Sequence, residues 1–262
     1  MDALNVKNMS VEFNENGFVV LRNFFSESEI DQLRKEIVET GKKLNTSGLN
    51  KDNLIFYSNC FLQSEWLRAF ITQEKIIRVL NELIGPDYWI RWDQCVAKAA
   101  GGAAFPWHQD NAYNRLKAQH FQFWIGITEM TEENGGLWLQ RGSHKNGLLP
   151  HSKVGNHLEC DLKPQNVEFM QANKGDVVIF SSLMLHHTKK NNSDGDRWAY
   201  VVEYMSAENY DPLIKPPFFM AAENGQRAGR FVETYKGRKR LSERLQYTSL
   251  HVKRALSSVL PI

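Results

Sequence analysis

The feature that most restricts the fold is a series of short β-strand patterns that starts at Tyr88 and has no helical pattern between its members. Segment 120–130 is the clearest, because apolar residues at its odd positions alternate with a mixed set at its even positions. A period of two marks a strand whose two faces lie in different surroundings. Many short strands without intervening helices predict an antiparallel barrel or jelly roll rather than βαβ units. Turn-forming clusters separate the candidates, which lie at 88–98, 120–130, 136–141, 166–171, 175–181 and 197–206.

The N-terminal third is predicted to be mainly helical. A turn at 14–17 leads into a short apolar strand, and Ser26 with Glu29 forms a capping-box pattern that opens a helix. Residues 64–84 have helical spacing and stop at Gly85-Pro86. We therefore expect a single domain over residues 1–262 that is mainly β, with helical support at about 26–84 and a jelly-roll core at about 88–206.

The end of the chain is basic. Residues 221–262 contain nine Lys or Arg and three Asp or Glu, whereas the rest of the chain has 23 and 27. We expect a helical C-terminal tail, an amphipathic helix docked through Leu241, Leu245 and Leu250. Such a tail would also suit an acyl-CoA or a carrier protein as partner. Nucleic acid is not expected, because no recognition motif accompanies the charge.

Cysteine usage and hydropathy predict a cytoplasmic protein. No apolar run approaches the roughly eighteen residues of a membrane span. The first residues lack the basic and apolar regions of a signal peptide. The three cysteines are widely spaced, which favours reduced thiols over a disulfide framework.

His108-Gln109-Asp110 is the first candidate for chemistry. On an extended segment, the imidazole and the carboxylate would lie on the same side of the chain. His186 follows the strand pattern at 175–181, and Arg197 comes eleven residues later. Two histidines and one carboxylate are the facial triad that holds non-haem Fe(II) and leaves coordination positions open. Alone, His108 could equally be a surface-loop histidine, and the combination with His186 and Arg197 is what favours a metal site.

These motifs resemble the phytanoyl-CoA dioxygenase family in order and spacing, from about Trp92 to Tyr204. Members are Fe(II)- and 2-oxoglutarate-dependent oxygenases built on a double-stranded β-helix, the cupin-like jelly roll. The motifs that carry the resemblance are His108-Gln109-Asp110, Glu133-Asn134-Gly135-Gly136-Leu137, Arg141-Gly142-Ser143-His144, Gly175-Asp176, Leu185-His186, Thr188, Asn191 and Arg197.

The resemblance implies that iron is held by His108, Asp110 and His186. His186 is preferred to its neighbour His187, because the family places its ligand ten intervening residues before the arginine. Arg197 would bind the distal carboxylate of 2-oxoglutarate, since a guanidinium fork matches a carboxylate bidentately.

The resemblance also places three side chains beside this cosubstrate: Thr188, Trp124 and Gln94. Three alternatives stay open at this point. Arg197 could pair with Glu203 or Asp196, Trp124 could belong to the core, and Thr188 could cap a turn.

The expected activity is that of a non-haem Fe(II)- and 2-oxoglutarate-dependent dioxygenase. It would hydroxylate an unactivated C–H of a small molecule, either a secondary metabolite or an acyl or amino-acid-type substrate. O₂ is consumed, succinate and CO₂ are released, and ascorbate is a candidate reductant. Halogenation is disfavoured, because Asp110 fills the position that chloride needs. The loop residues Tyr113, Arg115, Lys117 and Arg141 are expected near the pocket, which would suit an anionic or polar substrate.

Two other classes remain. A jelly-roll hydrolase or isomerase with another divalent metal would share the His and Asp ligands but would have no use for Arg197. A non-catalytic binding barrel would tolerate loss of the triad altogether.

Overall fold

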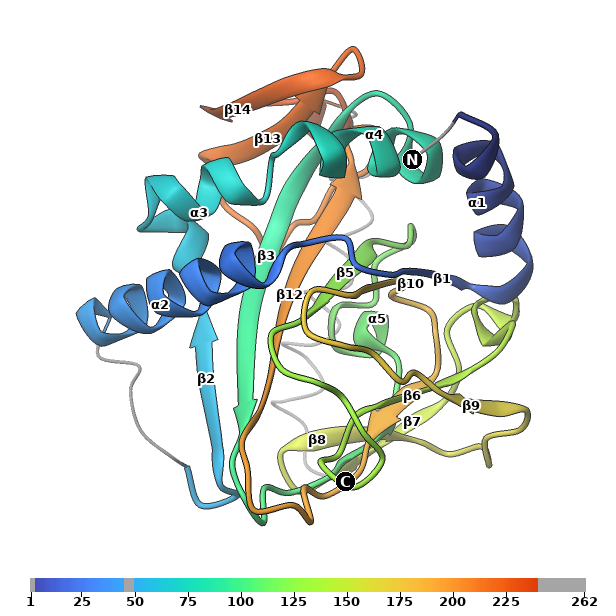
Figure 1. Ribbon diagram of the computed structural model, residues 1–262. Helices are drawn as coiled ribbons and strands as arrows, with labels where there is room; N and C mark the ends of the chain where they lie inside the picture. The colour runs from blue at the N-terminus through green and yellow to red at the C-terminus, as the bar shows by residue number, and fades with distance from the viewer. Residues whose placement is uncertain (1–2, 45–49, 240–262) are drawn as a thin grey trace, which may run out of the picture.

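The computed structural model describes residues 3–44 and 50–239, which form two antiparallel sheets with helices on one side (Figure 1). The larger sheet has the order β1-β10-β5-β12-β3-β13-β14, with β2 beside β3. Its strands are β1 Phe18–Leu21, β2 Leu54–Ser58, β3 Tyr88–Lys98, β5 Phe121–Gly126, β10 Val177–Ser181, β12 Arg197–Ser206, β13 Phe218–Glu223 and β14 Gln226–Val232.

The smaller sheet has the order β4-β11-β6-β9, and β7 pairs with β8 in a separate hairpin. The bounds of these strands are β4 Phe105–His108, β6 Leu137–Gln140, β7 His151–Val154, β8 His157–Cys160, β9 Val167–Phe169 and β11 His186–Thr188. This mainly-β architecture with N-terminal helices confirms the predicted jelly-roll class.

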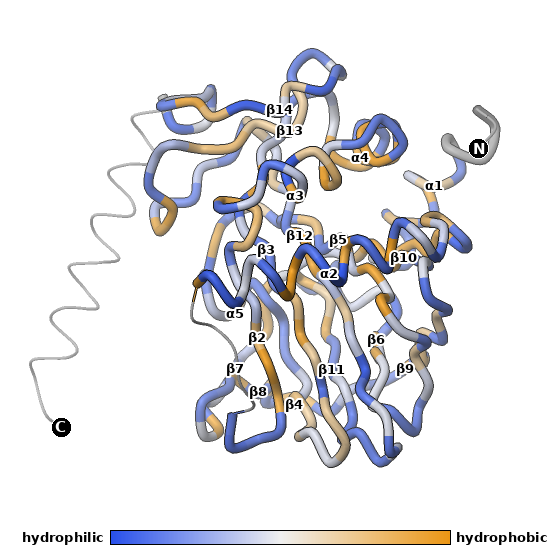
Figure 2. The backbone as a smooth tube through the Cα atoms, turned by 60° about the vertical axis from the view of Figure 1, so that its left-hand side comes forward, coloured by the Kyte–Doolittle hydropathy of each residue, from blue (hydrophilic) through white to orange (hydrophobic). Residues whose placement is uncertain are grey.

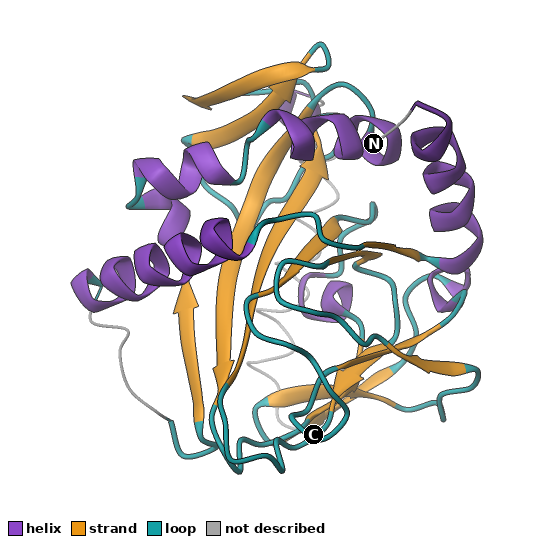
Figure 3. Cartoon of the chain, in the orientation of Figure 1, coloured by secondary structure: helices purple, strands orange, loops and turns teal. Residues whose placement is uncertain are grey.

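The four longest helices lie in the first part of the chain, as predicted, and Figure 3 draws the helices in purple beside the orange strands. They are α1 Ala3–Asn16, α2 Glu27–Lys43, α3 Glu65–Phe70, α4 Glu74–Ile84 and the short α5 Asp110–Asn114, with 3₁₀ turns at Cys60–Leu62, Ser143–Asn146 and Gly237–Lys239. None of the helices within the described ranges combines the length and apolarity that a membrane span requires.

Helix α2 follows from its sequence. The Ser26 backbone N–H donates to Glu29 Oε2 at 2.8 Å, and the Ser26 hydroxyl accepts from the Glu29 backbone N–H at 3.3 Å. This reciprocal pair satisfies two N–H groups that the first turn would leave without partners. Ile30, Leu33 and Ile37 are fully buried on one face, and Figure 2 shows hydrophobic and hydrophilic residues alternating along α2.

Strand β5 explains how the sheet separates two interiors. Phe123 and Ile125 belong to the core cluster that also contains the buried face of α2. Trp124 points the other way and belongs to a second cluster with Leu137 and Leu139 of β6, in the smaller sheet. The period of two in segment 120–130 therefore places one face toward the helices and the other between the sheets, where the site lies.

Several elements differ from the sequence predictions. Helix α1 was not predicted, and the expected single helix at 64–84 is broken into α3 and α4. Residues 221–232, expected as part of a helical tail, belong instead to the β13–β14 hairpin. Every residue of Phe218–Ala222 is buried, so this strand lacks the alternation that would have revealed it. The docking residues Leu241, Leu245 and Leu250 lie outside the described residues.

Candidate active site

Two histidines come together because their strands are paired. His186 begins β11, His108 ends β4, and the two are directly opposite in the antiparallel register. Their ring centroids are 4.2 Å apart. The neighbouring His187 faces away and stacks on Trp107, at 4.1 Å between ring centroids. His186 is therefore the histidine that the fold presents to His108.

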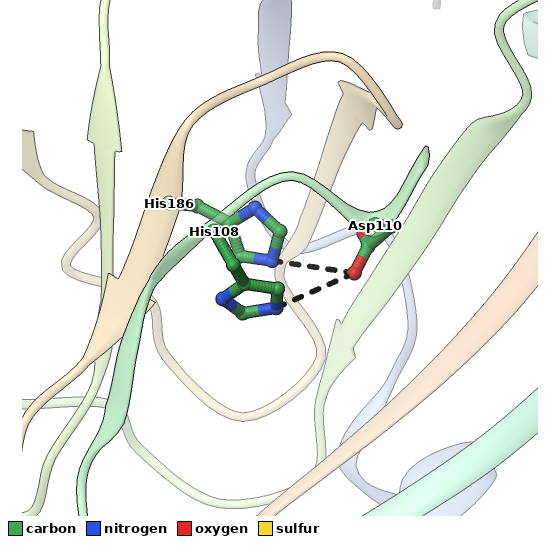
Figure 4. Close-up of side chains that lie close together, drawn as sticks. All are labelled: His108, Asp110 and His186. Atoms are coloured by element: carbon green, nitrogen blue, oxygen red, sulfur yellow. Dashed lines mark ion pairs between the residues drawn. The ribbon is translucent and has the colours of Figure 1, made fainter. Parts of the chain in front are cut away.

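The third side chain arrives by a turn rather than by an extended strand. Asp110 is the first residue of α5, so the expectation of a continuous extended segment was wrong, although the carboxylate still faces the imidazoles. Asp110 Oδ1 lies 3.5 Å from His108 Nε2 and 3.6 Å from His186 Nε2 (Figure 4). Ligand atoms from the three residues all lie within 4.8 Å of one another, close enough for one ion.

Backbone carbonyls set which ring nitrogens are free. His108 Nδ1 lies 2.8 Å from the Pro106 carbonyl oxygen, and His186 Nδ1 lies 3.0 Å from the Met184 carbonyl oxygen. A carbonyl oxygen can only accept, so each Nδ1 carries the proton and donates it. The lone pair of each neutral ring is then on Nε2, facing Asp110. This outer hydrogen bond is the arrangement that orients metal-binding histidines.

The protonation states also suit a divalent cation. Burial lowers the pKa of His186 to about 4, more than the nearby Asp110 carboxylate raises it. Burial would raise the pKa of Asp110, but the adjacent His186 and His108 outweigh it and lower that pKa to about 2. At neutral pH the set is therefore a neutral imidazole beside a carboxylate, the forms that bind metal.

An inner cavity of about 120 Å³ joins these three residues to the predicted cosubstrate residues. Four of those predicted from the sequence line it, namely Arg197, Thr188, Trp124 and Gln94. The Gln94 side-chain amide also donates to Ser58 Oγ at 2.8 Å. Trp124 belongs to a core cluster and also lines the cavity, so the core role and the role beside the cosubstrate are compatible.

Two buried basic side chains, Arg197 in this cavity and Lys98 beside its Thr188, have no carboxylate partner in the part of the chain that the structure describes. Arg197 is 2 % exposed, its Nε has no hydrogen-bond acceptor, and it pairs with neither Glu203 nor Asp196. Lys98 is directly opposite Arg197 across β3 and β12 and is fully buried. Its ammonium donates to Thr188 Oγ1 at 2.9 Å and to the Lys189 carbonyl oxygen at 2.5 Å.

This arrangement fits an anionic cosubstrate. A buried charge without a counter-ion is costly, and a dicarboxylate bound beside Arg197 would supply one. Burial lowers the pKa of Arg197 to about 10. Burial, and then the charge of Arg197, lower the pKa of Lys98 to about 6.

The sequence of the chain matches the family model for phytanoyl-CoA dioxygenase (PhyH) over residues 13–199. The chain belongs to the phytanoyl-CoA dioxygenase family. It is accordingly an Fe(II)- and 2-oxoglutarate-dependent oxygenase.

A curated relative is similar in sequence, and solved structures share the fold. A 2-aminoethylphosphonate dioxygenase from uncultured bacterium HF130_AEPn_1 is 25% identical over 206 residues, covering 74% of this chain and 79% of the relative. The non-heme monooxygenase ThoJ superposes with a TM-score of 0.72 at 19% identity, over 94% of this chain and 96% of ThoJ. The epimerase SnoN, solved with Fe³⁺, alpha-ketoglutarate and nogalamycin RO, gives 0.65 at 15% identity, over 86% and 88%.

Not every residue that was expected near the pocket of this family member is there. Tyr113 lines an outer cavity beside the metal-binding set. Arg141 instead pairs with Glu168, and Arg115 lines a separate hollow with Pro150 and His151. Lys117 is not among the lining residues of either cavity. The polar wall predicted from these side chains is therefore mostly wrong.

The sequence analysis missed two residues that support the site. Gln109 is fully buried, and its amide nitrogen donates to the carbonyls of Gly147 at 2.9 Å and Leu183 at 2.6 Å. Its side-chain oxygen accepts from the Leu149 N–H at 2.8 Å, so it ties the ligand-bearing turn to two loops. The alternation of side chains along an extended segment could have suggested that Gln109 faces the side opposite to His108 and Asp110. Lys98 carries no such signal, because a lysine at a strand end is ordinarily solvated.

His120 is a third residue that sequence reasoning did not place near the site. It is fully buried, and neither ring nitrogen has a hydrogen bond. Its Nε2 lies 3.5 Å from Glu203 Oε2. Burial lowers the pKa of His120, more than Glu203 raises it, which favours the neutral ring.

Proposed function

We propose that this oxygenase hydroxylates an unactivated C–H bond of a small molecule. His108, Asp110 and His186 would hold Fe(II), and Arg197 would hold the distal carboxylate of 2-oxoglutarate. One oxygen atom of O₂ would enter the product and the other succinate, with loss of CO₂. The observation that carries this proposal is the unpaired, buried Arg197 in the same cavity as the three ligand side chains.

The protein's contribution would be orientation and charge. When bound, Fe(II) would supply the activation of O₂, coupled to the oxidative decarboxylation of 2-oxoglutarate. The Pro106 and Met184 carbonyls hold the two imidazoles with Nε2 toward the metal position. Lys98 donates to Thr188 Oγ1, so the Thr188 hydroxyl proton is free to donate to a carboxylate beside Arg197.

Other reactions have less support. Asp110 occupies the position that a halide would need, which argues against halogenation. A hydrolase or isomerase would have no use for an unpaired guanidinium beside the metal position. An acyl-CoA or carrier-protein substrate rests on the basic C-terminal segment. Of its described cations, Arg230 pairs with Glu223 and Lys236 with Glu208, and neither lines the cavities.

The test is succinate formation by the purified chain with Fe(II), 2-oxoglutarate, O₂ and ascorbate as reductant. We expect slow succinate release without substrate, and a loss of more than about hundredfold in Asp110→Ala, larger than the cost of losing an outer-shell partner. The matched control is Asp194→Ala, which removes an exposed carboxylate and should behave as wild type. Unchanged turnover in Asp110→Ala would refute the ligand assignment, and metal-dependent turnover without 2-oxoglutarate would favour the hydrolase.

A further inference from the structure

A second, larger cavity of about 520 Å³ opens beside His108 and Asp110. This volume is within the range of sites for drug-sized ligands, and far exceeds what a small phosphonate fills. Aromatic rings make up much of its wall, contributed by Phe56, Trp92 and Phe105. Tyr113 adds a fourth ring next to the His108 imidazole, at 5.9 Å between ring centroids.

Negative charge is in excess on one wall of this cavity. Arg91 is its one Lys or Arg among the residues that the structure describes. The Arg91 guanidinium forms ion pairs with both Glu203 and Asp211, and all three residues are at least nine-tenths buried. One cation therefore faces two carboxylates, and Glu203 lines both cavities.

The imidazoles of His157 and His120 do not offset this excess at neutral pH. Burial lowers the pKa of His157, which lines the cavity, and that of His120, which lies beside Glu203. The pKa of Arg91 is raised, because its two carboxylates outweigh the effect of burial. By formal charge the cluster of Arg91, Glu203 and Asp211 is minus one, and Glu203 lines the cavity.

Anionic substrates fit such a wall poorly. A phosphonate, carboxylate or coenzyme A phosphate would meet no unpaired cationic side chain on the described lining, and would face Glu203, one of two carboxylates that share a single guanidinium. A cation gains twice, because Glu203 offers a counter-charge and the four rings offer faces for cation–π contact. An apolar body attached to that cation would fill the remaining ring-lined volume.

We infer that the substrate of this site is an apolar, drug-sized amine whose ammonium lies against Glu203 and the surrounding aromatic rings. The inference rests on the proposed function, in that the outer cavity is taken as the place where the oxidised molecule sits. It specifies charge and size, which neither the metal set nor the family membership defines.

The experiment compares three probes of the same shape and different charge: 2-(1-naphthyl)ethylamine, the matching alcohol, and 3-(1-naphthyl)propanoate. Binding is measured by calorimetry at pH 7 to the full chain with Mn(II) and 2-oxoglutarate under argon. We expect the amine to bind at least about tenfold more tightly than the propanoate, with the alcohol between them. Equal or tighter binding of the propanoate overturns the inference, as does the absence of any binding to protein that binds 2-oxoglutarate.

Variants locate the charge preference. Glu203→Gln should reduce the roughly tenfold preference for the amine over the propanoate to about threefold or less. Asp211→Asn should reduce the same preference by a smaller factor. The matched control is Glu223→Gln on β14's neighbour β13, where the paired Arg230 is exposed. If Glu203→Gln fails to fold, the three-probe series on the wild-type chain still decides.

If a folded Glu203→Gln variant keeps the wild-type preference for the amine, the placement of the ammonium against Glu203 is wrong. Binding of 2-oxoglutarate is measured in the same samples. If the wild-type chain does not bind 2-oxoglutarate, the proposed function is refuted. If it binds 2-oxoglutarate but the three probes bind in a different order, only the inference of an amine substrate is refuted.

Discussion

Two buried guanidinium groups lie on the paired strands β3 and β12, yet only one of them has carboxylate partners. Arg91, beside the outer cavity, is held by Glu203 and Asp211. Arg197, in the inner cavity, has no counter-ion in the described chain and lies opposite a second buried basic residue, Lys98. Arg91 therefore has its counter-charges within the folded protein. Arg197 gains a counter-charge only when an anion binds.

The largest expected effect is on stability at the paired site. Arg91→Met leaves two buried carboxylates without their cation, and we expect a loss of about 3–5 kcal/mol in the free energy of unfolding. Urea denaturation measures it. The comparison is with Arg230→Met, which removes an exposed ion pair and should cost no more than about 1 kcal/mol. A loss that small for Arg91→Met would mean that the pairing contributes little.

The unpaired site should respond in the opposite sense. Arg197→Met removes a buried charge that lacks a partner, so the ligand-free protein should be as stable as wild type or more stable. Affinity for 2-oxoglutarate should fall by about 2 kcal/mol or more, roughly thirtyfold in Kd. Calorimetry of binding and a melting curve on the same sample test both halves. A variant that is destabilised but binds normally would break the contrast between the two arginines.

Lys98 should have a smaller influence on the same ligand. Lys98→Met removes the donor to Thr188 Oγ1, and we expect 2-oxoglutarate affinity to fall by about 1 kcal/mol, less than in Arg197→Met. The control is Lys153→Met, which removes an exposed ammonium from β7. If Lys98→Met binds 2-oxoglutarate as tightly as wild type, the Thr188 hydroxyl needs no help in its orientation.

The last expected effect is a pH dependence of stability. In the folded ligand-free chain the pKa of Lys98 is about 6, whereas a lysine in the unfolded chain has a pKa near 10.4. Between these values the unfolded state binds more protons, so the contribution of Lys98 to stability increases as pH rises from 6 toward 10. Melting curves of wild type and Lys98→Met at pH 7 and pH 9 should differ in this direction. A difference that does not change with pH would show that Lys98 stays protonated.

Much of the fold could be predicted, because local patterns report on strands and caps. The bounds of β3 and β12 match the predicted 88–98 and 197–206, and the capping box at Ser26 forms as expected. The short strands β7 and β8 were missed, since both are mostly exposed or half-buried and carry no apolar alternation. The β13–β14 hairpin was missed because strand β13 is buried on both faces.

For the site, residue types together with the resemblance to the family selected His108, Asp110 and His186, which the structure brings within reach of one ion. The chain alone also defined the amphipathic face of α2 and the two faces of β5. Only tertiary structure decided that Glu203 pairs with Arg91 rather than Arg197, and that Lys98 is buried beside an unpaired guanidinium. The reason is physical: secondary structure and ligand type depend on neighbours in sequence, whereas counter-ion choice depends on distances between strands that are far apart along the chain.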